Sequence, residues 1–74
     1  MDKEVIKEIS KKYPDIKELF EKHQALEREV AQISQKGYLT PKEELKVKEL
    51  KKKKLYIKEL IYKLIKKYEG INID

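Results

Sequence analysis

The chain has no cysteine and no tryptophan, and it has only two glycines, two prolines and one histidine. Without cysteine, disulfides and thiolate-bound zinc are excluded, and the single His23 cannot build a metal site by itself. No apolar run approaches the roughly 20 residues of a membrane span, and the first residues lack the apolar segment of a signal peptide. These absences predict a soluble cytoplasmic protein with no metal, cofactor or membrane partner.

Charge, by contrast, is abundant. Charged residues make up 45% of the 74 residues, and the net charge is +5. The first 40 residues are neutral overall, so the whole excess lies in residues 41–74. Any electrostatic preference for an acidic partner is therefore expected in the second half of the chain. The many lysines and glutamates, with few amides, are also typical of proteins from hot environments.

Two apolar seams with a seven-residue rhythm dominate the pattern. The first consists of Ile16, Leu19, His23, Leu26, Val30 and Ile33. The second consists of Val47, Leu50, Lys54, Ile57, Ile61, Leu64 and Tyr68. Alternating steps of three and four keep one face of a helix against a partner helix. The sequence therefore predicts an all-α fold, an antiparallel, coiled-coil-like hairpin of two helices in one domain over residues 1–74.

Local signals set the predicted helix ends. A short amphipathic helix over about 2–12 precedes Pro14, which breaks it and can begin the next helix, over about 14–36. Gly37 is suited to end that helix in a left-handed conformation. Thr40, Pro41 and Glu43 form the signature of a capping box, and a third helix is expected over about 41–69.

The seams contain two polar residues, and they are expected to face each other. Across a turn centred near residue 38, His23 lies opposite Lys54. A polar layer of this kind fixes the register of a helical pair at some cost in stability. This structural role is favoured over a catalytic or binding role, because no third polar group completes a constellation around His23.

The third helix carries more apolar residues than one partner helix can cover. Leu55, Tyr62, Leu60 and Ile65 widen its stripe beyond the seam, and we predict that they form an interface. Ile6 and Ile9 of the first helix either cover this surface or compete for it. Otherwise two hairpins pair into a homodimeric four-helix bundle, or a helical partner protein binds there.

A lysine run offers an alternative function. Lys51, Lys52, Lys53 and nearby Lys58 could contact the phosphates of a nucleic acid through a basic third helix. Four consecutive helical residues point around almost the whole circumference, however, so the run 51–54 cannot form a single basic stripe. A solvated helix surface is the favoured interpretation, and nucleic-acid binding is the alternative.

Enzyme motifs are absent from the sequence. The only glycines are the two helix stops at 37 and 70, so there is no glycine-rich phosphate loop. Neither Ser10 nor Ser34 stands at a suggestive distance from the histidine, and the carboxylates are expected on exposed faces. The sequence predicts no catalytic residues and no small-molecule substrate.

Two short segments, Phe20–Leu26 and Lys51–Ile61, together resemble the pattern of the YdcH-like family of small bacterial proteins of unknown function. Phe20, His23 and Leu26 match the first part of its pattern. Lys54, Leu55, Ile57 and Lys58 match the second part, with Glu59 where an aspartate is usual. Tyr13 stands before Pro14 where the family often has asparagine. The resemblance covers roughly residues 14–65 and implies a helical hairpin, but no activity and no catalytic residues. A non-enzymatic interaction module is the function we predict.

Overall fold

The computed structural model describes residues 3–70 and contains three helices in that range: α1 (Lys3–Ser10), α2 (Pro14–Ser34) and α3 (Pro41–Glu69). Residue 2, where the first helix was predicted to begin, lies outside the described residues. Within them there is no strand, so the predicted all-α class is confirmed. The molecule measures 43 × 18 × 16 Å. The 29 residues of α3 alone span the longest dimension, since a helix rises by about 1.5 Å per residue.

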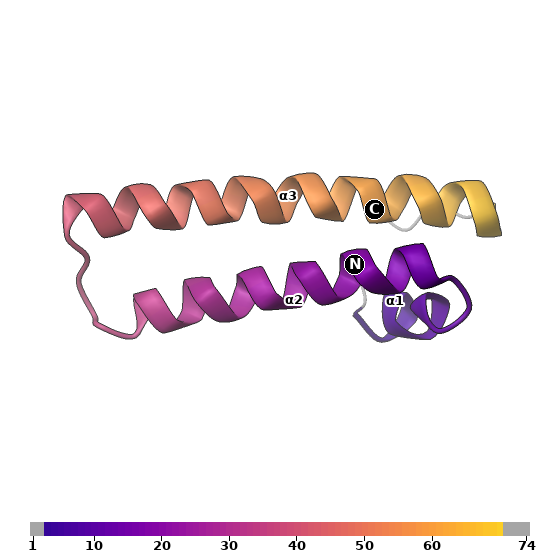
Figure 1. Ribbon diagram of the computed structural model, residues 1–74, viewed down its shortest axis with the longest axis horizontal. Helices are drawn as coiled ribbons and strands as arrows, with labels where there is room; N and C mark the ends of the chain where they lie inside the picture. The colour runs from indigo at the N-terminus through magenta and orange to yellow at the C-terminus, as the bar shows by residue number, and fades with distance from the viewer. Residues whose placement is uncertain (1–2, 71–74) are drawn as a thin grey trace.

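Helices α2 and α3 lie side by side and run in opposite directions (Figure 1). Tyr68, near the end of α3, donates a hydrogen bond from its hydroxyl to Asp15, at the start of α2, over 2.6 Å. Tyr13 stacks on the Tyr68 ring with 4.6 Å between centroids. The Tyr13 hydroxyl also donates to Glu69 over 2.6 Å. These tyrosine contacts join the two helices at the end opposite the turn over residues 35–40.

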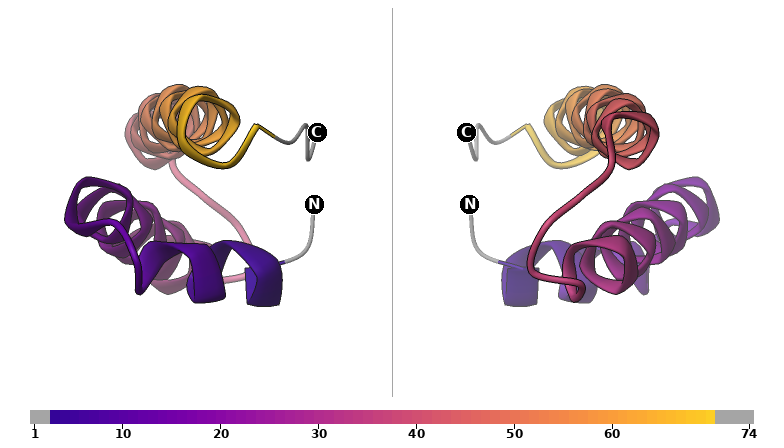
Figure 2. Two further views of the ribbon diagram at one scale, coloured as in Figure 1. Left: turned by 90° about the vertical axis from the view of Figure 1, so that its right-hand side faces the viewer. Right: turned by 90° about the vertical axis from the view of Figure 1, so that its left-hand side faces the viewer.

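Helix α1 crosses the pair at the end where α2 begins and α3 finishes (Figure 2). Its Ile6 and Ile9 are 1% and 6% exposed. They enter the main apolar core, which also contains Ile16, Phe20, Ile61 and Ile65. The first helix therefore covers the apolar flank of α3 that includes Ile65. A chain this short buries little apolar surface, and α1 enlarges the core at the end where the two long helices alone would leave it open.

The ends of the helices follow local chemistry, with small corrections. Tyr13, the residue before Pro14, is extended at φ −127° and ψ 109°, as expected for a residue that precedes proline. Helix α1 ends at Ser10 and α2 at Ser34, two residues before the predicted ends. The left-handed conformation expected of Gly37 is present at φ 84°. The predicted span 41–69 of the third helix is correct.

The start of α3 carries a complete capping box. The Glu43 backbone N–H donates to the Thr40 hydroxyl over 3.2 Å, and the Thr40 N–H donates to the Glu43 carboxylate over 3.0 Å. Glu43 also pairs with Lys36, and this ion pair is the main reason why the pKa of Glu43 falls to about 2. The lowered pKa keeps the Glu43 carboxylate charged at neutral pH, which is the form that best accepts the hydrogen bond from the Thr40 N–H.

Removing the Thr40 hydroxyl is expected to destabilise the protein. Thr40→Ala leaves the first N–H groups of α3 without their cap, and we expect the free energy of unfolding to fall by about 0.5–2 kcal/mol. Urea unfolding followed by circular dichroism measures this loss. Thr40→Ser retains the hydroxyl and should remain close to the wild type. Equal losses for the two variants would show that the cap contributes nothing.

Candidate functional site

A cluster of polar side chains surrounds Glu27 near the middle of α2. Lys3 of α1 donates to one carboxylate oxygen over 2.8 Å. The other oxygen lies 3.6 Å from Nδ1 of His23 and 3.9 Å from Nζ of Lys54. The hydrogen bond from Lys3 lowers the pKa of Glu27 most strongly, and the charges of Lys3, His23 and Lys54 lower it further. One carboxylate therefore links all three helices.

His23 is the most unusual member of this cluster. It is 7% exposed, and its Nε2 atom is buried without a hydrogen-bond partner among the described residues. Burial lowers the pKa of His23 below its ordinary value; the Glu27 charge opposes this shift, while Lys54, Lys3 and Lys58 reinforce it. The imidazole is therefore neutral near pH 7. A buried polar atom without a partner usually costs stability, which makes this atom a candidate for function.

A pocket of about 240 Å³, which we call the His23 pocket, lies beside this cluster. Its polar wall consists of Lys3, His23, Glu27, Lys54 and Lys58. Its apolar wall consists of Ile6, Phe20, Leu55 and Ile61. The predicted polar pair of His23 and Lys54 shares this pocket, with Glu27 in contact with both side chains.

A second and larger hollow follows the other side of the α2–α3 contact. This α2–α3 groove has a volume of about 460 Å³. It is lined by Leu19, Ala25, Leu26, Tyr56, Ile57 and Leu60, with the two lysines Lys22 and Lys53. Tyr56 is 64% exposed although it borders this apolar surface. The groove is thus a largely apolar surface that α1 does not cover.

The predicted interface residues do not form a single surface. Leu60 lines the α2–α3 groove, whereas Leu55 lines the His23 pocket. Five helical residues correspond to a rotation of about 140°, so these two leucines lie on opposite flanks of the seam. Tyr62 packs partly buried against the core, and the ammonium of Lys58 lies 5.9 Å from its ring centroid.

Three further residues of that prediction belong to the interior. Ile65 is 0% exposed, and Ile6 and Ile9 are buried with it in the main core. The prediction that Ile65 widens an exposed interface therefore needs correction, because α1 folds over its flank of α3. Ile6 and Ile9 were expected either to cover the apolar surface of α3 or to compete for it, and in the structure they cover it.

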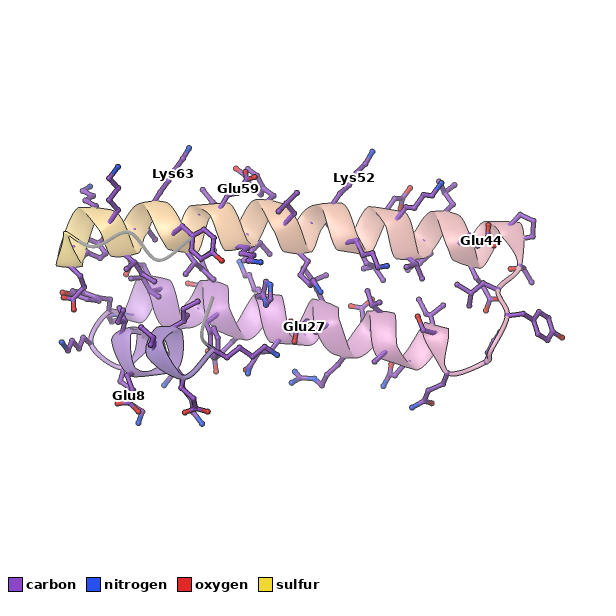
Figure 3. All side chains as sticks on the ribbon, turned by 180° about the vertical axis from the view of Figure 1, so that it is seen from behind. Glu8, Glu27, Glu44, Lys52, Glu59 and Lys63 are labelled. Carbon is purple, nitrogen blue, oxygen red and sulfur yellow. The ribbon has the colours of Figure 1, made fainter. Side chains whose placement is uncertain are left out.

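The lysines of the alternative nucleic-acid hypothesis are also divided. Lys53 lies in the α2–α3 groove and Lys58 in the His23 pocket. Lys51 and Lys52 are exposed, and Lys52 points away from α2 together with Glu59 and Lys63 (Figure 3). The outer face of α3 thus alternates positive and negative side chains and offers no continuous basic stripe at this point.

Two members of the polar cluster were missed by the sequence interpretation. Glu27 lies four residues after His23, a spacing that places both on one side of a helix, so it could have been found. Lys3 carried no such signal, because it reaches Glu27 only when α1 folds back. The described residues contain no group of three or more histidine or acidic side chains that could hold a metal ion. None of the three described helices combines the length and apolarity of a membrane span.

These features define a small all-α protein with a mixed polar pocket on one side of its long helices and an apolar groove on the other. Residues 16–65 match the model of the family described as "Protein of unknown function (DUF465)", and the chain belongs to this family. No curated protein and no solved structure matches the chain.

Proposed function

We propose that the chain is a non-enzymatic interaction module, an antiparallel helical hairpin that self-associates through its α2–α3 groove. The observation that carries this proposal is the groove itself, about 460 Å³ of hollow lined mainly by aliphatic side chains and Tyr56. Apolar grooves between helices are common docking sites for another helix. The resemblance to the small bacterial YdcH-like proteins is compatible with the DUF465 match, and on that resemblance alone we place this module in the bacterial cytoplasm.

Charge complementarity favours a second copy of the chain as the occupant. Beyond the groove, α2 carries Glu18 and Glu29 eleven residues apart, which places them on one edge of the helix. The edge of α3 carries Lys46, Lys53 and Lys67 at multiples of seven residues, in line with Leu60. Lys22 of α2 is neutralised in part by Glu18, 3.6 Å away. Because Lys22 offsets one of the two glutamates, the α2 edge keeps a small negative charge. The three lysines outnumber Glu49 on the α3 edge, which is therefore basic.

A dimer with its two-fold axis parallel to the helices brings these oppositely charged edges together. It places α2 of one copy against α3 of the other, so that acidic edges meet basic edges and every neighbouring pair is antiparallel. This is the arrangement of a four-helix bundle. A two-fold axis perpendicular to the helices would instead place α2 against α2 and bring like charges together.

The test compares two neighbouring exposed residues of α3. Tyr56→Glu places a charge in the groove and is expected to convert the dimer into a monomer, measured as molar mass by light scattering after gel filtration. Leu55→Glu introduces the same charge on the other flank, 56% exposed in the wild type, and should leave the mass unchanged.

Each alternative outcome is informative. A wild type that stays monomeric at every concentration would refute self-association. Binding of an amphipathic peptide with acidic edges by that monomer would then identify a different helix as the occupant. If only Leu55→Glu lost the dimer, the interface would lie on the Leu55 flank of α3, and the proposed groove interface would be wrong.

A further inference from the structure

The wall of the His23 pocket has an excess of positive charge. Three lysines and one carboxylate line it. Glu27 accepts a 2.8 Å hydrogen bond from Lys3 but lies 3.9 Å from Nζ of Lys54, so this second pair is loose. Lys58 has no ion pair within residues 3–70, and its ammonium lies over the Tyr62 ring instead. With His23 neutral, the pocket has about two positive charges that no carboxylate of its wall balances.

A second, independent feature concerns His23 itself. Its side chain is more than nine-tenths buried and lines the pocket, and its Nε2 atom has no hydrogen-bond partner among the described residues. Nδ1 lies toward Glu27, 3.6 Å away. An apolar residue could fill this seam position equally well. The unpaired nitrogen of His23 therefore lowers the stability of the fold without being needed for packing. Nε2 itself has no exposed surface, so a ligand in the pocket would act on the imidazole ring through its charge and not through a hydrogen bond from this atom.

The apolar wall limits the kind of ligand. Ile6, Phe20 and Ile61 are almost fully buried and form the floor, while Leu55 is 56% exposed at the rim. The volume of about 240 Å³ is below the range of about 300–1,000 Å³ that is typical of drug-sized ligands. The pocket therefore suits a small molecule with an apolar body and one charged end.

We propose that the His23 pocket binds a small organic carboxylate, with its charged group beside His23, Lys54 and Lys58 and its apolar part against the floor. The site is separate from the α2–α3 groove and does not depend on self-association. The anion would stabilise the protonated imidazole, so that binding is accompanied by proton uptake and strengthens as the pH falls. The groups that face His23 are Lys3 of α1, Glu27 of α2, and Lys54 and Lys58 of α3.

Benzoate is a suitable probe, and benzyl alcohol is its neutral counterpart of similar size. Because His23 is the only histidine, its ring signals in an NMR spectrum report on the pocket without overlap. We expect benzoate to shift these signals to saturation and to raise the pH at which His23 titrates. Benzyl alcohol should do neither. The absence of a saturable shift, or an equal response to both molecules, would overturn the proposal.

A pair of charge-matched variants separates the pocket from general attraction to a basic protein. Lys58→Gln removes a charge from the pocket wall and is expected to weaken benzoate binding by about threefold to fivefold. Lys63→Gln removes the same charge from a side chain that points away from α2 (Figure 3) and should leave binding unchanged. Equal weakening by both variants would overturn the proposal, since it would show attraction to net charge alone.

Glu27→Gln gives a result in the opposite direction. The carboxylate competes with the ligand for Lys3 and Lys54, so its removal should tighten benzoate binding, provided that circular dichroism shows the helices intact. Weaker binding in a folded Glu27→Gln protein would contradict the proposed placement of the anion. If that variant unfolds, the comparison of Lys58→Gln with Lys63→Gln still decides the question.

Discussion

Ile65→Ala is expected to lower the free energy of unfolding by about 2–5 kcal/mol, the largest stability effect of any substitution considered for this protein. Ile65 is 0% exposed and lies in the core that α1, α2 and α3 share. Truncation removes buried carbons and leaves a cavity that three helices line, and the surrounding side chains can fill it only in part. Small domains have total stabilities of about 5–15 kcal/mol, so a large fraction of the stability would be lost.

Urea unfolding monitored by circular dichroism measures this effect. Leu55→Ala is the matched control, because it removes a similar side chain from a site that is 56% exposed, and its effect should stay within about 0.5 kcal/mol. Ile65→Val is the milder variant, expected to cost about 0.5–1.5 kcal/mol, and it keeps the test possible if the alanine variant does not fold. A loss at Ile65 no greater than that at Leu55 would contradict the placement of α1 over this flank.

Much of the fold could be predicted because its signals are local. Thr40 and Glu43 define the start of α3, because the side chain of each accepts a hydrogen bond from the backbone N–H of the other, and Pro41 occupies the first turn. Gly70 ends α3 with φ 70°, and its N–H donates to the Lys66 carbonyl over 2.9 Å. The ends of α1 and α2 were less certain, because neither helix is followed directly by a glycine and helix ends commonly vary by one or two residues.

The spacing of apolar residues could not predict which of the two flanks of α3 stays exposed. The seven-residue rhythm places Ile65 and Leu60 at known angles around the helix, but it does not say on which side α1 folds. The structure places Ile6 and Ile9 in one buried cluster with Ile61 and Ile65, so that flank is covered and the flank with Leu60 stays open.

The His23 pocket shows the same division between local and tertiary information. The seam indicated that His23 was enclosed and that Lys54 lay near it, and helical spacing would have added Glu27. Lys3 and Ile6 come from a different helix, and only the folded arrangement brings them to the pocket. The unpartnered Nε2 atom is likewise a property of the packing. A binding role for His23 therefore became a reasonable hypothesis only with the structure.

His23→Leu is expected to stabilise the protein and to remove the loss of stability that His23 causes as the pH falls below about 6.5. The substitution replaces a buried nitrogen that has no hydrogen-bond partner within residues 3–70 by a side chain of similar size that needs none. Leaving a buried polar atom unpaired costs about 1–3 kcal/mol, so we expect the free energy of unfolding near pH 7 to rise by about 1 kcal/mol. A leucine also continues the apolar seam of α2.

The sign of the pH effect follows from the two states of His23. In the unfolded chain it has its ordinary pKa of 6.5, and in the folded protein burial lowers that pKa. As the pH falls below about 6.5, the unfolded chain takes up a proton before the folded protein does, which favours unfolding. The wild type should therefore lose stability from about pH 6.5 downward until the folded imidazole is also protonated, whereas His23→Leu should not show this loss.

Urea unfolding at a series of pH values, for both proteins, gives the difference that belongs to His23. Groups that do not interact with His23 contribute equally to both profiles. Glu27 is the exception, because the charge of His23 helps to lower its pKa, but that pKa lies below its ordinary value of 4.5 and so outside this range. Parallel profiles would show that the folded and unfolded imidazoles titrate alike. A less stable His23→Leu variant at pH 7 would show that Nε2 is satisfied after all. Greater stability combined with loss of benzoate binding would instead mean that the chain retains a costly histidine for its ligand, a trade-off that is common at binding sites.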